Sequence, residues 1–402
     1  MVSSVRIGTL LELQGGEKGE DDSNMNNPFR LNIEGLERVL VSLQQKGYEV
    51  IGPRHTDGVI VYDRIHSIDD LPAGFVDELT PGMYRLTNNG SRQFFGYTLP
   101  PQSWKRFLYP PRRELFTFRK DGKSFGLAPK EDQTPAYAFV GVRACELGAI
   151  SIQDRVFSSG DYRDEAYLSA RRRNFIIAVN CSHAAENCFC TSTGNGPKAG
   201  AGFDIVLTEI VNEDSHYFVA ETGSDVGTSL MEGIGAGRAD ESDVDAAEET
   251  IRKACDTVRK SLDTSDLPKL LADNTDHPQW EDVAKRCLTC GNCTMVCPTC
   301  FCSTVEDTTD LTGRIAGRTR TWDSCFTMDF AKVSGGNFRI SAKSRYRQWL
   351  THKLSSWVEQ FGVSGCVGCG RCITWCPVGI DLTAEVSAIK GGATKQESGG
   401  SR

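Results

Sequence analysis

Common signatures of nucleotide-dependent and hydrolytic enzymes are missing from this chain of 402 residues. It has neither a Gly-x-x-x-x-Gly-Lys-Ser/Thr phosphate loop nor a His-Glu-x-x-His zinc motif. The glycine-rich string at 233–237 follows a helix-like stretch, whereas a dinucleotide loop follows a strand. We therefore expect no flavin or nicotinamide site and no substrate site in this chain.

Long apolar runs are missing as well. The longest, AYAFVGV and FIIAV, are far shorter than the ~20 residues that cross a bilayer. The first residues, MVSSVRIGTLLELQGG, lack the apolar core of a signal peptide. Acidic residues outnumber basic ones, and the net charge of −8 argues against a nucleic-acid partner. We expect a cytoplasmic protein without membrane insertion.

Cysteine, by contrast, is abundant. The chain has 16 cysteines, and eleven of them lie between Cys287 and Cys376. Thiols stay reduced in the cytosol, so clustered cysteines there bind metal more often than they form disulfides. The placement of the cysteines therefore predicts metal centres concentrated in the C-terminal part.

Two cysteine runs, at 287–298 and 366–377, share the spacing Cys-x2-Cys-x2-Cys-x3-Cys-Pro. This is the run of bacterial two-cluster ferredoxins, in which three cysteines wrap one [4Fe–4S] cluster and the fourth binds the other. The alternative is a pair of zinc sites, but these usually use separated Cys-x2-Cys pairs. We expect two crossed clusters: cluster A with Cys287, Cys290, Cys293 and Cys376, and cluster B with Cys366, Cys369, Cys372 and Cys297.

Four cysteines in the N-terminal half form a candidate third site. Cys145 and Cys181 each follow an expected strand, and Cys188 and Cys190 lie in the loop SHAAENCFCTSTGNGP. Ligands bind where the carboxyl ends of parallel strands meet, and four thiolates are enough for a third [4Fe–4S] cluster. A zinc site and plain structural thiols are the alternatives, because this spacing matches no standard signature.

The other cysteines are isolated or lie between the two runs. We expect Cys255, which lies alone on the bridging helix, to be buried in the hydrophobic core, since free cysteine is among the most buried residues. The segment between the two cysteine runs is an insert relative to a small ferredoxin, and it contains Cys300, Cys302 and Cys325. These three cysteines either pack beside the clusters, bind a further metal centre or act as redox-active thiols. We expect His183 on a surface loop, with a place beside the ligands of the third site as the alternative, and His352 on a basic helix, either solvated or capping a neighbour.

Hydrophobic periodicity predicts a mixed α/β domain followed by a helical, two-cluster ferredoxin-like domain with a long insert. A helix is expected between Asn32 and Gly47, and the apolar runs at 136–142 and 175–181 enclose another helix in a βαβ unit. Further strands are expected at 48–53, 57–65, 203–210 and 216–223, helices at 239–262 and 341–361, and an irregular connection at 96–126. The expected parts are a flexible segment at 1–28, the α/β domain at 29–238, a bridging helix and linker at 239–277, the dicluster domain at 278–385 and a disordered tail at 386–402.

Five strings, in this order, carry a resemblance to a known family: GVRACELGAI, NCFCTSTGNGP, CLTCGNCTMVCPTCFC, RTWDSC and CVGCGRCITWCPVGIDL. They are similar to the β subunit of cytosolic NAD(P)-linked [NiFe] hydrogenases, the sulfhydrogenases, and to the related iron–sulfur subunit of anaerobic sulfite reductase. The family's first string usually reads Arg-Pro-Cys-Asp, where this chain has Arg143, Ala144, Cys145 and Glu146. The chain therefore keeps the cysteine and loses the proline.

The resemblance implies an iron–sulfur electron-transfer subunit that belongs to an oxidoreductase complex and has no bond chemistry of its own. Its implied partners are a flavin subunit that handles NAD(P)H and the small and large subunits of a [NiFe] hydrogenase. In one alternative the same relay serves the catalytic subunit of a sirohaem sulfite reductase. Two alternatives from other classes are a thiol oxidoreductase that uses the insert cysteines and a zinc-stabilised scaffold.

Overall fold

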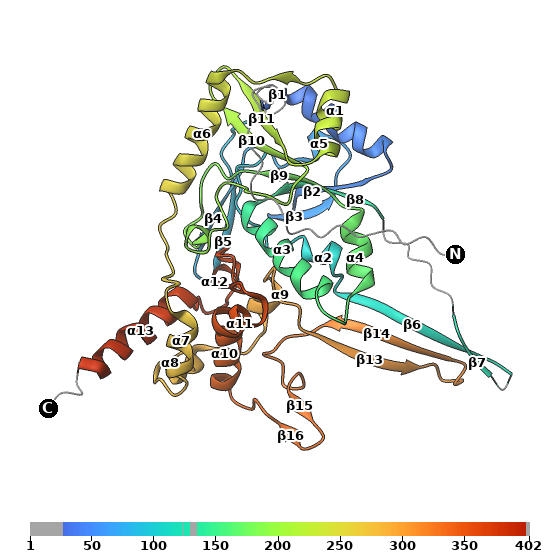
Figure 1. Ribbon diagram of the computed structural model, residues 1–402, viewed down its shortest axis with the longest axis vertical. Helices are drawn as coiled ribbons and strands as arrows, with labels where there is room; N and C mark the ends of the chain where they lie inside the picture. The colour runs from blue at the N-terminus through green and yellow to red at the C-terminus, as the bar shows by residue number, and fades with distance from the viewer. Residues whose placement is uncertain (1–26, 123, 129–134, 399–402) are drawn as a thin grey trace, which may run out of the picture.

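The computed structural model describes residues 27–122, 124–128 and 135–398, so most of the expected flexible segment at 1–28 lies outside the described residues. A mixed eight-stranded sheet forms the centre of the N-terminal part (Figure 1). Its order is β12-β1-β11-β10-β9-β8-β2-β3. The strands are β1 (Phe29–Asn32), β2 (Glu49–Thr56), β3 (Val59–Arg64), β8 (Tyr137–Val142), β9 (Phe175–Val179), β10 (Ile205–Val211), β11 (His216–Thr222) and β12 (Gly237–Arg238).

The four central strands of this sheet, β2, β8, β9 and β10, run parallel to one another. All five residues of β9 are buried, as expected for a strand that is covered on both faces. The βαβ arrangement expected from the apolar runs is therefore present, and β8 and β9 end on the same edge of the sheet.

Helices cover both faces of the sheet. On one face lie α1 (Ile33–Gln45) and α5 (Asp225–Gly233), and on the other α2 (Lys105–Leu108), α3 (Ala144–Ser158) and α4 (Glu165–Arg172). The first helix begins as expected, because the Asn32 side chain accepts a hydrogen bond from the Gly35 amide. The acidic-to-basic helix α6 (Glu241–Asp256) packs on β10 and β11 through Ala247.

The C-terminal part is mainly helical. Its helices are α7 (Leu267–Asp273), α8 (Gln279–Arg286), α9 (Asn292–Met295), α10 (Ala342–Thr351), α11 (Trp357–Phe361), α12 (Arg371–Thr374) and α13 (Leu382–Ser398). A π-helical turn over His352–Ser356 joins α10 to α11 within the expected helix at 341–361. The last helix differs from the disordered tail expected from residue 386: it runs to Ser398, and its first turns are fixed because Val386 and Ile389 are buried in the core.

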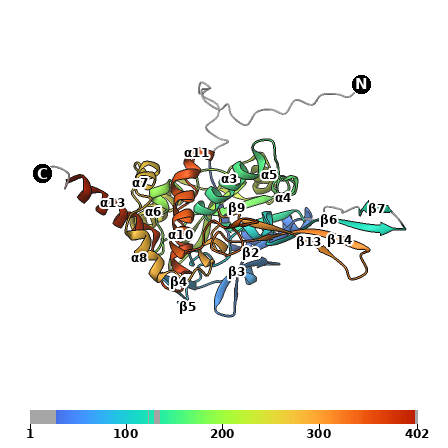
Figure 2. The same ribbon diagram turned by 90° about the horizontal axis from the view of Figure 1, so that it is seen from below.

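A four-stranded sheet extends away from the body as an arm (Figures 1 and 2). It consists of β13 (Ser303–Thr309), β14 (Ile315–Trp322), β6 (Arg112–Asp121) and β7 (Ser124–Leu127), in that order. The irregular connection expected at 96–126 is therefore wrong over its second half. Local pattern could not reveal these strands, because β6 pairs with a strand some 200 residues further along the chain.

The described residues also form two small hairpins: β4 (Phe75–Thr80) with β5 (Met83–Asn88), and β15 (Lys332–Val333) with β16 (Gly336–Asn337). Among the helices of the described ranges, none has the length and apolar character needed to cross a membrane.

Candidate metal centres

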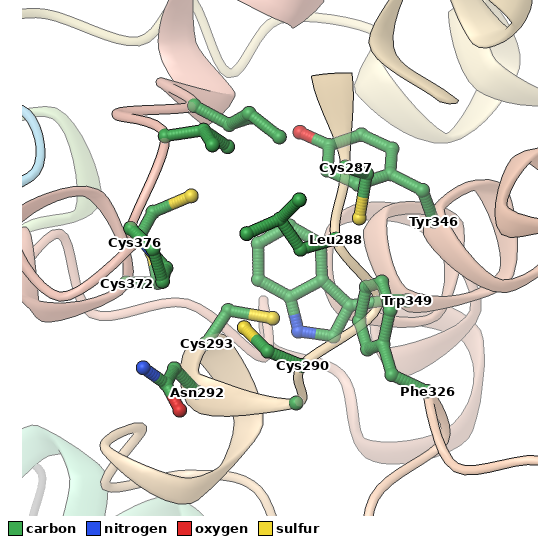
Figure 3. Close-up of a pocket in the computed structure, with 14 residues that line it drawn as sticks. Cys287, Leu288, Cys290, Asn292, Cys293, Phe326, Tyr346, Trp349, Cys372 and Cys376 are labelled. Atoms are coloured by element: carbon green, nitrogen blue, oxygen red, sulfur yellow. The ribbon is translucent and has the colours of Figure 1, made fainter. Parts of the chain in front are cut away.

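Four cysteines from both runs surround one cavity, the expected cluster A site (Figure 3). The sulfurs of Cys287, Cys290, Cys293 and Cys376 point into the shared space. Three aromatic side chains form part of the wall: Phe326, Tyr346 and Trp349. The fourth cysteine comes from the second run, so the cavity has the crossed composition that a two-cluster ferredoxin requires.

A left-handed glycine shapes the loop of each run. Gly291 has φ +78° and begins α9, which carries Cys293. Gly370 has φ +75° and begins α12, which carries Cys372. A side chain at such a φ is strained, so glycine lets each loop turn sharply into the helix that presents the third cysteine.

The cysteines expected for cluster B also lie together. Burial raises the pKa of Cys372 well above its usual value, and the neighbouring Cys366, Cys369 and Cys297 raise it further. Burial likewise raises the pKa of Cys366 to about 12. Because metal binding needs thiolates, a metal centre here must displace protons from these thiols.

Cys297 differs from its neighbours because polar groups surround its sulfur. The Lys353 ammonium donates a hydrogen bond to Cys297 Sγ at 3.1 Å, and Thr299 Oγ1 lies 3.1 Å from the same atom. A hydrogen bond from the Cys300 thiol and the charge of Lys353 hold the pKa of Cys297 well below its usual value, although burial opposes them. This sulfur is therefore prepared to act as a thiolate.

The third candidate site lies at the carboxyl ends of β8 and β9. A single cavity there is lined by all four expected cysteines: Cys145, Cys181, Cys188 and Cys190. Burial raises the pKa of the first three above the usual value and that of Cys190 to about 12. The missing proline does not disrupt the loop, since Arg143 donates to the carbonyl oxygens of Phe95 and Tyr97 at 2.8 and 2.6 Å.

The third site and the cluster B site are neighbours. Cys369 lines the third cavity together with the four N-terminal cysteines. The Phe189 amide donates to the Gly368 carbonyl at 2.9 Å. A Cβ atom at Gly368 would lie 2.6 Å from the Cys190 Cα, and one at Gly370 only 2.3 Å from the Asn187 oxygen. Both positions need glycine because the two backbones touch.

The cluster A and cluster B sites adjoin in turn, since Cys372 of the second set also lines the cluster A cavity. The three groups of thiols therefore form one continuous series through the molecule. The sequence predicted each group and left their order open.

A buried ion pair fastens the third site to the cluster B site. Arg371 donates to Glu146 at 2.7 Å, and both side chains are 1% exposed. Glu146 also accepts hydrogen bonds from Tyr62 and Trp104, at 2.8 and 3.0 Å. Since Glu146 follows Cys145 and Arg371 precedes Cys372, the pair fixes the separation of two candidate ligands.

Several single residues lie elsewhere than expected. Cys255 is exposed on α6 and not part of the core. His183 lines the third cavity, where burial lowers its pKa to about 4. His352 is half-buried and accepts a hydrogen bond from Trp357 Nε1 at 3.0 Å. Burial also lowers the pKa of His352 to about 4, so it is not a solvated charge.

The insert cysteines Cys300, Cys302 and Cys325 lie together beside the cluster B site and line a further cavity. The sequence pattern does not single out the two buried lysines next to them, Lys105 and Lys353. Their only signal in the sequence is the interleaving of basic and aromatic residues, which also describes an exposed surface.

The donor chemistry of the cavities is that of cubane clusters. Thiolate sulfur is the usual ligand of iron–sulfur clusters. A cluster needs sulfurs spread around a space, whereas a single zinc ion draws its four ligands to one point. Within the described ranges, no three histidine, cysteine or acidic side chains are close enough to share one metal ion.

Comparison with known proteins agrees with this geometry. A family described as a 4Fe-4S dicluster domain matches residues 286–380. Sulfhydrogenase 2 subunit beta of Pyrococcus furiosus is 29% identical over 353 residues, which cover 85% of this chain and 92% of that protein. Over most of its length the chain is similar to a sulfhydrogenase β subunit. No solved structure matches it. The resemblance read from the five cysteine-containing strings is thus confirmed, and the C-terminal part carries a dicluster ferredoxin-type domain.

Proposed function

We propose that this chain is an electron-relay subunit of a cytoplasmic hydrogenase complex. In this proposal it binds three [4Fe–4S] clusters, at the cluster A, cluster B and third sites. Clusters bound there supply one-electron carriers. The observation that carries the proposal is the shared wall between neighbouring sites: Cys372 also lines the cluster A cavity, and Cys369 also lines the third cavity.

The side chains of this chain would position the carriers and tune their potentials. The buried aromatic residues Trp349 and Tyr346 form an apolar part of the wall of the cluster A site. Lys353 places a positive charge 3.1 Å from the Cys297 sulfur, which favours the reduced, more negative state of a centre at this position. Arg371, together with Glu146, holds the third site against the cluster B site.

The proposed partners follow from the sulfhydrogenase-like sequence. One is a flavin subunit that exchanges electrons with NAD(P)H, and the others are the small and large subunits of a [NiFe] hydrogenase. In this role the chain takes electrons from one partner and passes them to the other, and it makes or breaks no bond of a substrate.

Anaerobic purification of the intact complex from its source cells tests this proposal. We expect a flavoprotein and [NiFe] subunits to copurify, and hydrogen gas to bleach the iron–sulfur absorbance of the complex. A Cys145→Ser variant, which lacks one ligand of the third site, should slow hydrogen-dependent NAD(P) reduction, whereas Cys255→Ser serves as the matched control. A sirohaem partner, or clusters that hydrogen cannot reduce, would contradict the hydrogenase proposal.

A further inference from the structure

Three cysteines of the insert belong to none of the three proposed sites. Cys300, Cys302 and Cys325 line one cavity of about 380 Å³ beside the cluster B site. Cys300 and Cys302 follow the first cysteine run directly, and Cys325 follows the end of β14. The insert therefore brings together thiols that lie more than 20 residues apart in the chain.

The loop that carries the first two of these cysteines is held from several directions. Lys105 Nζ donates to the carbonyl oxygens of Cys297 and Cys300, at 3.0 Å each. Gln153 Nε2 donates to the Pro298 carbonyl at 2.8 Å, and the Asp323 amide donates to the Cys302 carbonyl at 2.9 Å. Such fixed loops are typical of sites whose ligands are arranged before the metal binds.

The charged side chains that line the cavity are basic. Lys353 and Arg339 line it, and the residues that line it include no aspartate or glutamate. Lys105 and Lys353 are each only 4% exposed. Within the described ranges neither lysine forms an ion pair with a carboxylate, which is unusual because a buried charge normally needs a partner of opposite sign.

The cluster B site compensates only part of this charge. Lys353 faces Cys297, which belongs to that site. Lys105 contacts the backbone carbonyls of Cys297 and Cys300 and, among the described residues, no thiol sulfur directly, and its ammonium lies 3.9 Å from the centre of the Trp322 ring, three residues before Cys325. A second anionic group between the insert cysteines would neutralise Lys105 and Arg339.

We infer that Cys300, Cys302 and Cys325 bind a fourth iron–sulfur cluster, held by three protein thiolates. The cavity can admit a cubane, and three thiolates supply the negative charge that the surrounding cations require. His352 also lines the cavity, but its Nε2 already accepts a hydrogen bond from Trp357. A cluster held by these three thiolates would leave its fourth iron without a cysteine ligand. This inference holds whichever catalytic partner the relay serves.

Iron and acid-labile sulfide analysis of the anaerobically purified, full-length chain tests the inference. Four clusters predict about 16 irons per chain, and three predict about 12. A Cys325→Ser variant should lose about four irons and keep the EPR signals of the other clusters. Cys255→Ser, at an exposed cysteine of α6, is the matched control and should lose none.

Oxidation of the unmodified chain gives a second readout that needs no variant. With ferricyanide as the oxidant, a cluster held by three thiolates passes one electron to ferricyanide and releases its fourth iron as Fe²⁺, which leaves a [3Fe–4S] cluster. We expect that EPR signal in the unmodified chain and its absence in Cys325→Ser.

Specific results would overturn the inference. About 12 irons in the unmodified chain, unchanged by Cys325→Ser, would exclude the fourth cluster and leave the three-cluster relay intact. Zinc in this cavity, or a disulfide between Cys302 and Cys325, would also exclude it. Absence of iron from the whole chain would refute the proposed relay as well, so the two failures are distinguishable.

Discussion

Replacement of Glu146 by glutamine should destabilise the chain strongly. Glu146 and Arg371 are each 1% exposed and lie 2.7 Å apart, so Glu146→Gln leaves a buried guanidinium without its carboxylate partner. Breaking a buried pair in this way costs about 3–5 kcal/mol. Glu146 also accepts hydrogen bonds from Tyr62 and Trp104, which places the expected loss toward the upper end of that range.

Anaerobic urea unfolding, followed by tryptophan fluorescence and cluster absorbance, measures this loss. The double variant Glu146→Gln with Arg371→Met removes the unpaired charge and should recover part of the stability. The matched control is Arg252→Met, which breaks exposed ion pairs on α6 and should cost little stability, because solvent screens these charges. If Glu146→Gln costs no more than this control, the pair does not fasten the two sites as argued.

Other parts of the account have their own tests. Cys376 lies in the second run, but Cys376→Ser should remove cluster A, which the first run wraps. Metal analysis should then find about four irons fewer. Loss of cluster B instead would contradict the crossed assignment. Gly370→Ala should weaken the junction with the third site, since the added Cβ would lie 2.3 Å from the backbone carbonyl oxygen of Asn187. Iron of the third site should then be lost faster during anaerobic chelation. An unchanged rate of iron loss would contradict the proposed role of this contact. Lys353→Met should lower the potential of the cluster bound through Cys297, as followed by an EPR redox titration, and an unchanged potential would argue against this charge effect. Burial raises the pKa of Asp77 to about 6, so its contribution to folding is full at low pH and is lost as pH rises through about 6; the free energy of unfolding should fall over this window in the unmodified chain and not in Asp77→Asn.

Much of the fold could be predicted because the relevant signals are local. The βαβ unit around 136–181 has two continuous apolar runs of strand length, and α1 has both helical periodicity and an asparagine cap. The arm is different, because β6 and β14 come from distant segments and are largely exposed. Strands of this kind are determined by their partner and carry little periodicity of their own.

In the candidate sites, too, some features follow from local sequence and others from tertiary packing. The spacing within the cysteine runs predicts which residues surround the cluster A cavity, because the first three cysteines of a run wrap one cluster and the fourth reaches the other. The junction between the third site and the cluster B site depends on a contact between Phe189 and Gly368, far apart in sequence. The buried roles of Lys105 and Lys353 likewise depend on tertiary packing, which the sequence does not encode locally.

The central claim is that three adjoining sets of cysteines hold three clusters that act as one redox chain. EPR spectroscopy of the stepwise-reduced, anaerobically purified protein, combined with iron analysis, tests it most directly. The account predicts at least about 12 irons per chain and reduced-state signals that broaden and split as neighbouring clusters become paramagnetic together. Zinc in place of iron, or signals that stay sharp and independent at full reduction, would contradict it.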